Sequence, residues 1–224
     1  MKCIIACILL AANLMKHAAA QDAVPDQPPV PPHEMSVALF NQKDFSGWTF
    51  VTKNHADPSQ TWSVTNGVIH CTGRPAGYLR TTQVYSNYFL TVEWRFVKIT
   101  PQADNTGILV HIQPRDQVWP QCVRVQGKHG RQGDLFLMAG AEAKEHKGMN
   151  ANTPVPLRGD SVEVPVGEWN KFETICIHHK VESFMNSQFV NEITECTLNS
   201  GYIGIQSAGG EIEIRSIVYT PLKY

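Results

Sequence analysis

Apolar and polar residues alternate along much of this chain with a period of two, the pattern of strands with one buried face. In residues 89–97 every even-numbered position is apolar, while Glu93 and Arg95 occupy odd-numbered ones. A Thr-Asn-Gly turn at 65–67 separates two further strand-like runs and predicts a hairpin, because Asn-Gly accepts positive φ. Similar runs occupy residues 107–113, 121–126, 171–178, 181–185, 201–206 and 211–217.

Short strands separated by turns predict an all-β fold made of two antiparallel sheets, a β-sandwich or jelly roll. One sheet face would then be apolar and build the core. The stretch 139–156 lacks a pattern, and we expect a long surface loop there, of the kind that often borders binding sites. Nothing in residues 36–224 suggests a second domain, and all-β domains of about 200 residues are common.

The polar side of the alternating strands is the candidate binding surface. Long polar side chains across a curved sheet suit a sugar, which offers many hydroxyls and an apolar ring face. The simpler interpretation, a solvated outer sheet with surface ion pairs, stays open for each residue taken alone. We expect these side chains on one shared face: Glu93, Arg95, His111, Arg124, Gln126, Gln206 and, at a strand start, Asp134.

Residues 1–20 have the features of a signal peptide: Lys2, then an apolar run, then three alanines before Gln21. Residues 21–35 contain five prolines and predict an extended linker. The apolar run is too short to span a bilayer, and no later run approaches that length. We therefore expect a secreted or periplasmic protein with no membrane span.

Charge limits the partners to be expected, and the cysteine content limits the possible disulfides. Removal of the signal peptide would leave 17 basic and 20 acidic residues without a basic block, so nucleic acid is not an expected partner. Four cysteines would remain, which permits two disulfides or four buried free thiols. The chain lacks a phosphate-binding glycine loop, a nucleophile elbow and a His-Glu-x-x-His motif. The cysteines in question are Cys71, Cys122, Cys176 and Cys196.

A series of motifs resembles the 3-keto-disaccharide hydrolase family, in the same order and over about residues 40–222. No single motif is specific, but their order is hard to obtain by chance. They lie at 40–48 (FNQKDFSGW), 62–69 (WSVTNGVI), 73–81 (GRPAGYLRT), 89–95 (FLTVEWR), 105–108 (NTGI), 133–134 (GD), 167–170 (GEWN), 201–207 (GYIGIQS) and 211–215 (EIEIR).

This resemblance implies a concanavalin A-like, laminin-G-like sandwich in a secreted bacterial protein. It also implies activity on glycosides whose C3 hydroxyl has been oxidised to a ketone. Similar members have an acidic residue before a Val-Gln pair, where this chain has Arg124. If that acid is catalytic, its replacement argues against activity.

A 3-keto glycoside can be cleaved by removal of the C2 proton, loss of the C1 substituent and addition of water. This route needs a base, a cation or donor at the C3 oxygen and an acid for the leaving group. We assign Glu93 or Asp134 as base, Arg95 or Arg124 as the stabilising cation, and His111 as acid. No cofactor is expected; a divalent metal would serve as the cation, but no ligand set is evident. The expected substrate-binding residues are Gln126, Gln206, Trp119 and Asn105, with Trp119 as the sugar-stacking aromatic.

Two alternatives from other classes stay open at this point. One is a carbohydrate-binding module that uses the same face without catalysis, which Arg124 favours. The other is a protein-interaction domain, since laminin-G-like sandwiches often have that role. The sequence does not indicate an oligomeric state.

Overall fold

The computed structural model describes residues 35–100, 105–150 and 152–223. The predicted signal peptide and all of the predicted linker except Met35 lie outside the described residues. Within those residues we find no helix long and apolar enough to cross a membrane.

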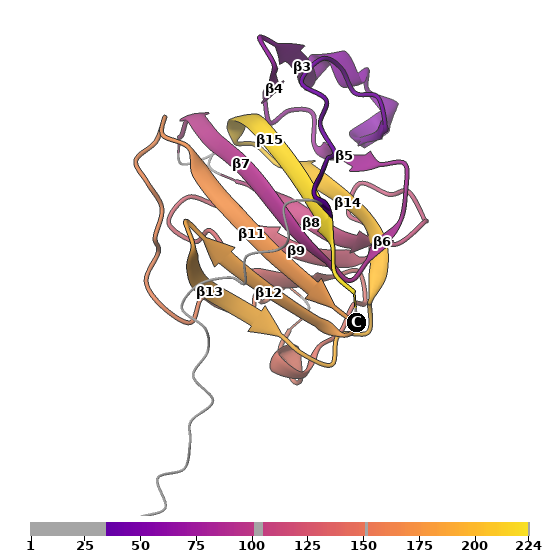
Figure 1. The fold of residues 1–224 in the computed structure, drawn as a ribbon, viewed down its shortest axis with the longest axis vertical. Coiled ribbons are helices and arrows are strands. Elements are labelled where there is room, and N and C mark those ends of the chain that lie inside the picture. Colours follow the sequence, from indigo (N-terminus) through magenta and orange to yellow (C-terminus); the bar gives the residue numbers. More distant parts are fainter. Residues whose placement is uncertain (1–34, 101–104, 151, 224) are drawn as a thin grey trace, which may run out of the picture.

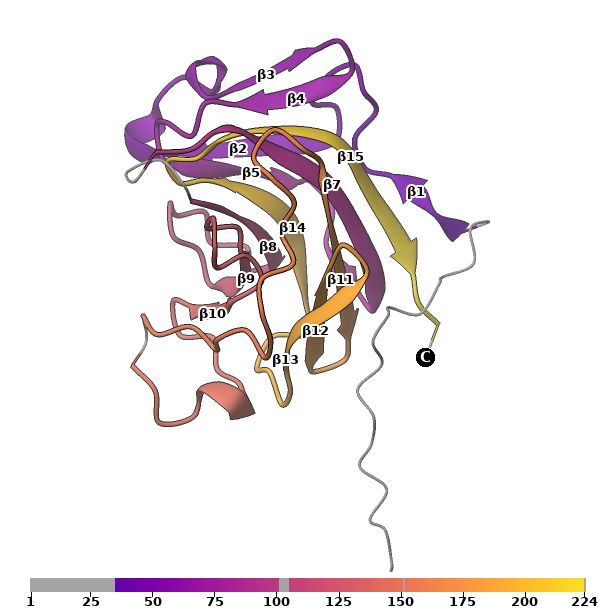
Figure 2. The ribbon, with the colours of Figure 1, turned by 90° about the vertical axis from the view of Figure 1, so that its left-hand side faces the viewer.

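The described chain forms two antiparallel sheets packed face to face, which confirms the predicted sandwich (Figures 1 and 2). We name the eight-stranded one sheet A, and its β1 (Val37–Ala38) pairs with β15. The remaining strands of sheet A are, in spatial order, β13 (Gln188–Ile193), β12 (Lys180–Met185), β11 (Asn170–Ile177), β7 (Tyr88–Lys98), β15 (Glu211–Pro221), β4 (Val68–Cys71) and β3 (Trp62–Thr65).

Sheet B has seven strands, and its β6 (Tyr85–Ser86) pairs with β14. Three short 3-10 helices connect strands: η2 (Lys53–His55), η3 (Pro58–Gln60) and η4 (Lys144–His146). The other strands of sheet B are, in spatial order, β10 (Leu135–Met138), β9 (Cys122–Gln126), β8 (Thr106–Ile112), β14 (Ser200–Ser207), β5 (Gly77–Thr81) and β2 (Trp48–Thr52).

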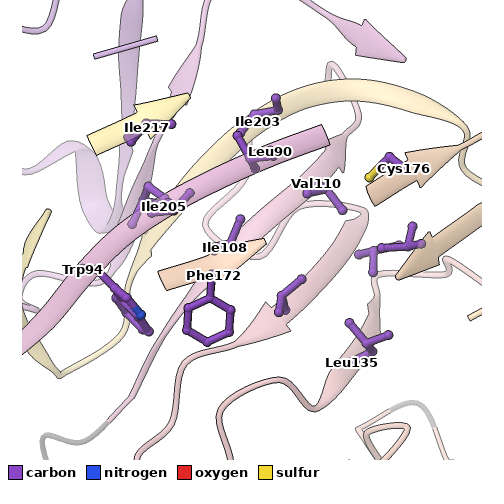
Figure 3. Packing of buried hydrophobic residues seen from close by; sticks show 14 of the residues in the cluster. Leu90, Trp94, Ile108, Val110, Leu135, Phe172, Cys176, Ile203, Ile205 and Ile217 are labelled. Carbon is purple, nitrogen blue, oxygen red and sulfur yellow. The ribbon is translucent and has the colours of Figure 1, made fainter. Parts of the chain in front are cut away.

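The core lies between the sheets and follows from the alternation in the sequence. On β7 the even-numbered residues from Tyr88 to Phe96 are buried, so Leu90 and Trp94 face the interior, as predicted. Ile108 and Val110 of β8 meet them from sheet B (Figure 3). Burial of large apolar side chains from both sheets supplies the main stabilisation of such a fold.

The predicted hairpin at 65–67 joins β3 to β4. Asn66 and Gly67 both have positive φ, 53° and 77°, and the flanking strands pair antiparallel. These angles suit the right-handed twist of a two-residue hairpin. The prediction of this hairpin is confirmed.

All four cysteines of the described chain are free and buried, which decides between the two expectations in favour of thiols. Burial raises the pKa of Cys71, Cys122 and Cys176 to about 12. A thiol that stays protonated is a poor nucleophile and a poor metal ligand. The cysteines therefore act as small apolar side chains, Cys71, Cys122 and Cys176 in strands and Cys196 in the connection between β13 and β14.

Candidate functional site

The outer face of sheet B carries two rows of side chains that run across its strands. In one row Tyr78, Gln206, Gly107 and Gln126 are successive pairing partners. In the neighbouring row the successive pairing partners are Arg80 of β5, Gly204, Leu109, Arg124 and Phe136. The pairing register therefore places two guanidinium groups, two amides and two aromatic rings on one face.

Arg124 is the central charged residue of this face. Its Nη2 donates to Oε1 of Gln126 at 2.7 Å, and its Nη1 donates to Oε1 of Gln206 at 3.3 Å. The guanidinium carbon lies 4.1 Å from the centre of the Phe136 ring, within the range of a cation–π contact. Arg124 is only 9% exposed, and its burial lowers the pKa of the guanidinium.

Gly107 makes room for Arg124 at the middle of the sheet. A Cβ at Gly107 would stand 3.0 Å from Cγ and 3.1 Å from Cδ of Arg124. Such distances are tight, so a side chain here would displace the arginine stem. The absence of a Cβ lets Arg124 lie along β8 and reach Gln206 on β14.

A hollow of about 520 Å³ opens beside Arg124. Arg124 and Phe136 border it on the sheet, and Trp119, which is 49% exposed, borders it from the preceding loop. Ala139, Gly140 and Asn152 also line the hollow. They belong to the segment predicted as a long surface loop, and this segment does border the hollow.

The loop that carries Trp119 is tied to the sheet by an ion pair. Nε and Nη2 of Arg80 donate to the two carboxylate oxygens of Asp116 at 3.0 and 3.1 Å. The guanidinium carbon of Arg80 also lies 4.0 Å from the centre of the Tyr202 ring. A bidentate pair of this kind fixes direction as well as distance, so it restricts the loop close to Trp119.

Asp134 stands at the edge of this face with both carboxylate oxygens engaged. Oδ2 accepts from Nε and Nη2 of Arg131 at 2.9 and 2.8 Å, and Oδ1 accepts from the backbone N–H of Leu157. Its charge is close enough to Arg124 to raise the pKa of that guanidinium, although burial acts more strongly in the opposite direction. The side chain is 1% exposed, so a substrate would have to displace Arg131 to reach it.

Glu93 and Arg95 do not share this face, so the expectation of a single polar surface is wrong for them. Both lie on β7 of sheet A, on the side opposite the core. Oε2 of Glu93 accepts from Arg215 at 2.8 Å, and Nε of Arg95 donates to Glu213 at 2.7 Å. Trp169 is stacked on the guanidinium groups of both Arg95 and Arg215. This surface is a network of ion pairs, as in the simpler interpretation.

His111 also departs from the expected face, because a β-bulge interrupts β8. The register shifts opposite Tyr202 and Gly204, and His111 has a φ of 56°. His111 therefore turns into the core, where its ring meets the Tyr88 ring edge-on, while Ile112 joins the outer apolar cluster. A fully buried imidazole away from the hollow is not placed to protonate a leaving group there.

The environment of His111 favours the neutral ring. Neither ring nitrogen has a hydrogen-bond partner within the described residues. Burial lowers the pKa of His111 to about 4, and the nearby Leu198 backbone offsets part of this shift. His111 is thus neutral at physiological pH and structural in position.

Three of the four predicted substrate-binding residues lie at this face or at the hollow, and one does not. Gln126 and Gln206 hold Arg124, and Trp119 lines the hollow. Asn105 lies elsewhere: its carbonyl accepts from the backbone N–H of Gly210, at the turn between β14 and β15. Asn105 therefore supports a turn and does not border the hollow.

Sequence reasoning missed Phe136 and Tyr78. Phe136 follows Asp134 by two residues, so alternation along β10 would have placed it on the same face. Tyr78 has no comparable signal, because β5 is buried along nearly its whole length. In the described part of the chain, no group of three or more His, Cys, Asp or Glu side chains is arranged to hold a metal ion.

The two packed antiparallel sheets form a concanavalin A-like β-sandwich of the jelly-roll class. Within this class, residues 35–219 match the model of the 3-keto-alpha-glucoside-1,2-lyase-like domain. The chain belongs to that family. No curated protein sequence matches the chain.

Solved structures of low sequence identity share the fold. A candidate glycosyl hydrolase from Parabacteroides distasonis ATCC 8503 has a TM-score of 0.63 at 21% identity, over 85% of this chain and 95% of that one. The carbohydrate-binding module CBM66 from Bacillus subtilis has a TM-score of 0.57 at 10% identity, over 78% and 95%. A β-glucanase from Bacillus licheniformis has a TM-score of 0.54 at 11% identity, over 84% and 98%.

Proposed function

We propose that this protein binds a carbohydrate on the outer face of sheet B, in the hollow between Arg124 and Trp119. The observation that carries the proposal is the pairing of a half-exposed indole with a fixed guanidinium at one hollow. An aromatic ring can stack on the apolar face of a sugar, and a guanidinium can donate to its oxygens. The family and the sugar-related names of the structural neighbours support a carbohydrate as the ligand.

The test is a calorimetric titration with a panel of neutral and acidic disaccharides that includes 3-keto-glucosides. The best binder is then measured with Trp119→Ala, for which we expect affinity to fall at least about tenfold, or 1.4 kcal/mol. Trp169→Ala is the matched control, because Trp169 stacks on arginines of sheet A and should leave the affinity unchanged. Equal affinities of the Trp119 variant and the unsubstituted protein would contradict this site.

Cleavage of a 3-keto glycoside is the second candidate function, and membership of the lyase-like family favours it. A base takes the C2 proton, and the C2–H electron pair forms an enediolate whose charge rests on the C3 oxygen. That charge then expels the C1 oxygen with its bonding pair, and the released aglycone takes up a proton. Water adds across C1 and C2, which completes the hydrolysis.

On this face Arg124 is the group suited to the enediolate oxygen, since a guanidinium stabilises developing negative charge. Asp134 is the remaining candidate base, after Glu93 is assigned to the other sheet. It would have to exchange its ion pair with Arg131 for the substrate. The ion-paired carboxylate of Asp134 and the burial of His111 favour binding over cleavage on this face.

Release of aglycone from a 3-keto-glucoside separates the two candidates. Turnover that falls at least about a hundredfold in Asp134→Asn would establish the cleavage function. Saturable binding of a sugar without aglycone release would leave the binding function alone. Glu93→Gln is the control carboxylate, and its turnover should equal that of the unsubstituted protein because Glu93 faces away from the hollow.

Export through the predicted signal peptide completes the proposal, with the protein acting on glycosides in the periplasm or outside a bacterial cell. The motivation is the charged, apolar and small-residue pattern of residues 1–20. Cell fractionation with N-terminal sequencing tests it. A cytoplasmic protein that retains residues 1–20 would contradict it.

A further inference from the structure

Among the residues that the structure describes, the Arg124 guanidinium is a buried cation without a counter-ion of its own. Within the described residues, its hydrogen bonds go to the side-chain oxygens of Gln126 and Gln206, which are neutral amides. Its Nε–H is buried and has no acceptor there. A guanidinium has five N–H donors, so most of its capacity is unused. A buried charge is costly unless it is paired.

Two described carboxylates at or beside this face are already matched by other cations. Asp134 is held by two nitrogens of Arg131, and Asp116 is held by two nitrogens of Arg80. Each pair is close to neutral as a unit. The positive charge of Arg124 is therefore left over on the face.

The surroundings of Arg124 also fix its orientation. Phe136 covers one side of the guanidinium plane, and the two glutamines hold its Nη atoms. The stem lies along the glycine at position 107, where a Cβ would crowd it. A cation fixed in this way loses little further entropy on binding, and a planar fork matches a carboxylate.

We propose that the sugar held in this hollow is acidic, a hexuronic acid residue whose carboxylate pairs with Arg124 while its ring contacts Trp119. The inference rests on the proposed binding function and adds the substrate class to it. It follows from the unmatched guanidinium at the hollow and from the half-exposed indole that borders the same space.

Three matched disaccharides test the proposal by calorimetry: one ending in glucuronic acid, one ending in glucose, and one ending in glucose 6-sulfate. We expect the glucuronide to bind at least about tenfold more tightly than the glucose form, a difference of 1.4 kcal/mol. Arg124→Gln should remove this preference, so that the glucuronide and the glucose form bind with equal affinity. Arg124→Lys keeps the charge but lacks the fork, so it should retain part of the preference.

Arg95→Gln is the control for a change of charge alone, because Arg95 lies on the outer face of sheet A. It should leave the preference intact. Thermal unfolding of each variant shows whether it is folded. Should Arg124→Gln fail to fold, the comparison rests on Arg124→Lys, which should weaken the preference for the glucuronide without abolishing it.

The outcomes separate this inference from the function on which it rests. Equal binding of the glucuronide and the glucose form overturns the acidic-sugar proposal and leaves carbohydrate binding standing. Tighter binding of the sulfate than of the glucuronide also overturns it, since the carboxylate is then not the group selected. Failure of all three sugars to bind, in a panel where no other sugar binds, overturns both proposals.

Discussion

The ring of His111 meets the ring of Tyr88 edge-on between the two sheets, with 5.9 Å between the ring centres and 84° between the ring planes. His111 is fully buried, and its pKa in the folded protein is about 4. The unfolded chain takes up a proton on this residue near pH 6.5. Folding is therefore opposed by proton uptake on the unfolded chain below that pH.

The first prediction concerns acid stability. Above about pH 6.5 the neutral His111 costs the folded protein no stability. As the pH falls toward 4, the unfolded chain gains a proton on His111 that the folded protein does not, and the free energy of unfolding falls by about 3 kcal/mol. Urea unfolding at intervals of half a pH unit measures it, with His111→Phe as the comparison. The difference in pH dependence between the two proteins should lie in this window. Identical slopes would show that His111 is not held neutral.

The second prediction concerns the bulge that turns His111 inward. A Cβ at Gly201 would stand 2.3 Å from the carbonyl carbon of His111, a distance that requires the backbone to move. We expect Gly201→Ala to lower the free energy of unfolding by about 3 kcal/mol. Gly159→Ala is the control, because nothing lies within 4 Å of a Cβ there. A change below about 0.5 kcal/mol at Gly201 would contradict the close approach.

The fold was predictable because alternation is a local property. Period-two burial on β7 and the Asn-Gly turn before β4 each depend on a few neighbouring residues. Alternation states which residues share one side of one strand. It does not state which sheet the strand joins, and so Glu93 and Arg124 were grouped although β7 lies in sheet A and β9 in sheet B.

The rest of the site depends on contacts between distant segments. The inward turn of His111 requires a glycine at position 201, ninety residues further along the chain. Arg124, Gln126 and Gln206 were predicted together correctly, because each lies on the polar side of a strand of the same sheet. Their polar side chains were enough to select these three residues. Their hydrogen bonds and their burial could be seen only in the packed sheet.

The third prediction concerns the ion pair that anchors the Trp119 loop. Arg80 also stacks on Tyr202, so a single substitution would remove more than the pair. A double-mutant cycle of Arg80→Gln and Asp116→Asn isolates the pair, and we expect a coupling of about 1 kcal/mol in unfolding. Sugar affinity should fall several-fold in both single variants, because the loop is less restricted. Independent effects that simply add would show that the pair does not hold the loop.

The fourth prediction concerns the cysteines. Buried thiols with a pKa of about 12, as at Cys71, Cys122 and Cys176, should not react with an aromatic disulfide reagent in the folded protein. They should react once the chain is unfolded in urea. The melting temperature should be the same with and without a reducing agent. A lower melting temperature on reduction would reveal a disulfide and contradict this arrangement.

Trp119 provides a fluorescence signal for binding in the hollow. It is 49% exposed at the rim, whereas Trp48, Trp62 and Trp94 are buried in the core. The emission of an indole moves to shorter wavelength when water leaves its surface. A ligand that covers Trp119 therefore changes the intrinsic fluorescence of the protein, while the buried indoles and Trp169, which stacks on arginines of sheet A, contribute a constant background. Occupancy of the hollow can then be followed in real time without a label on the protein or on the sugar.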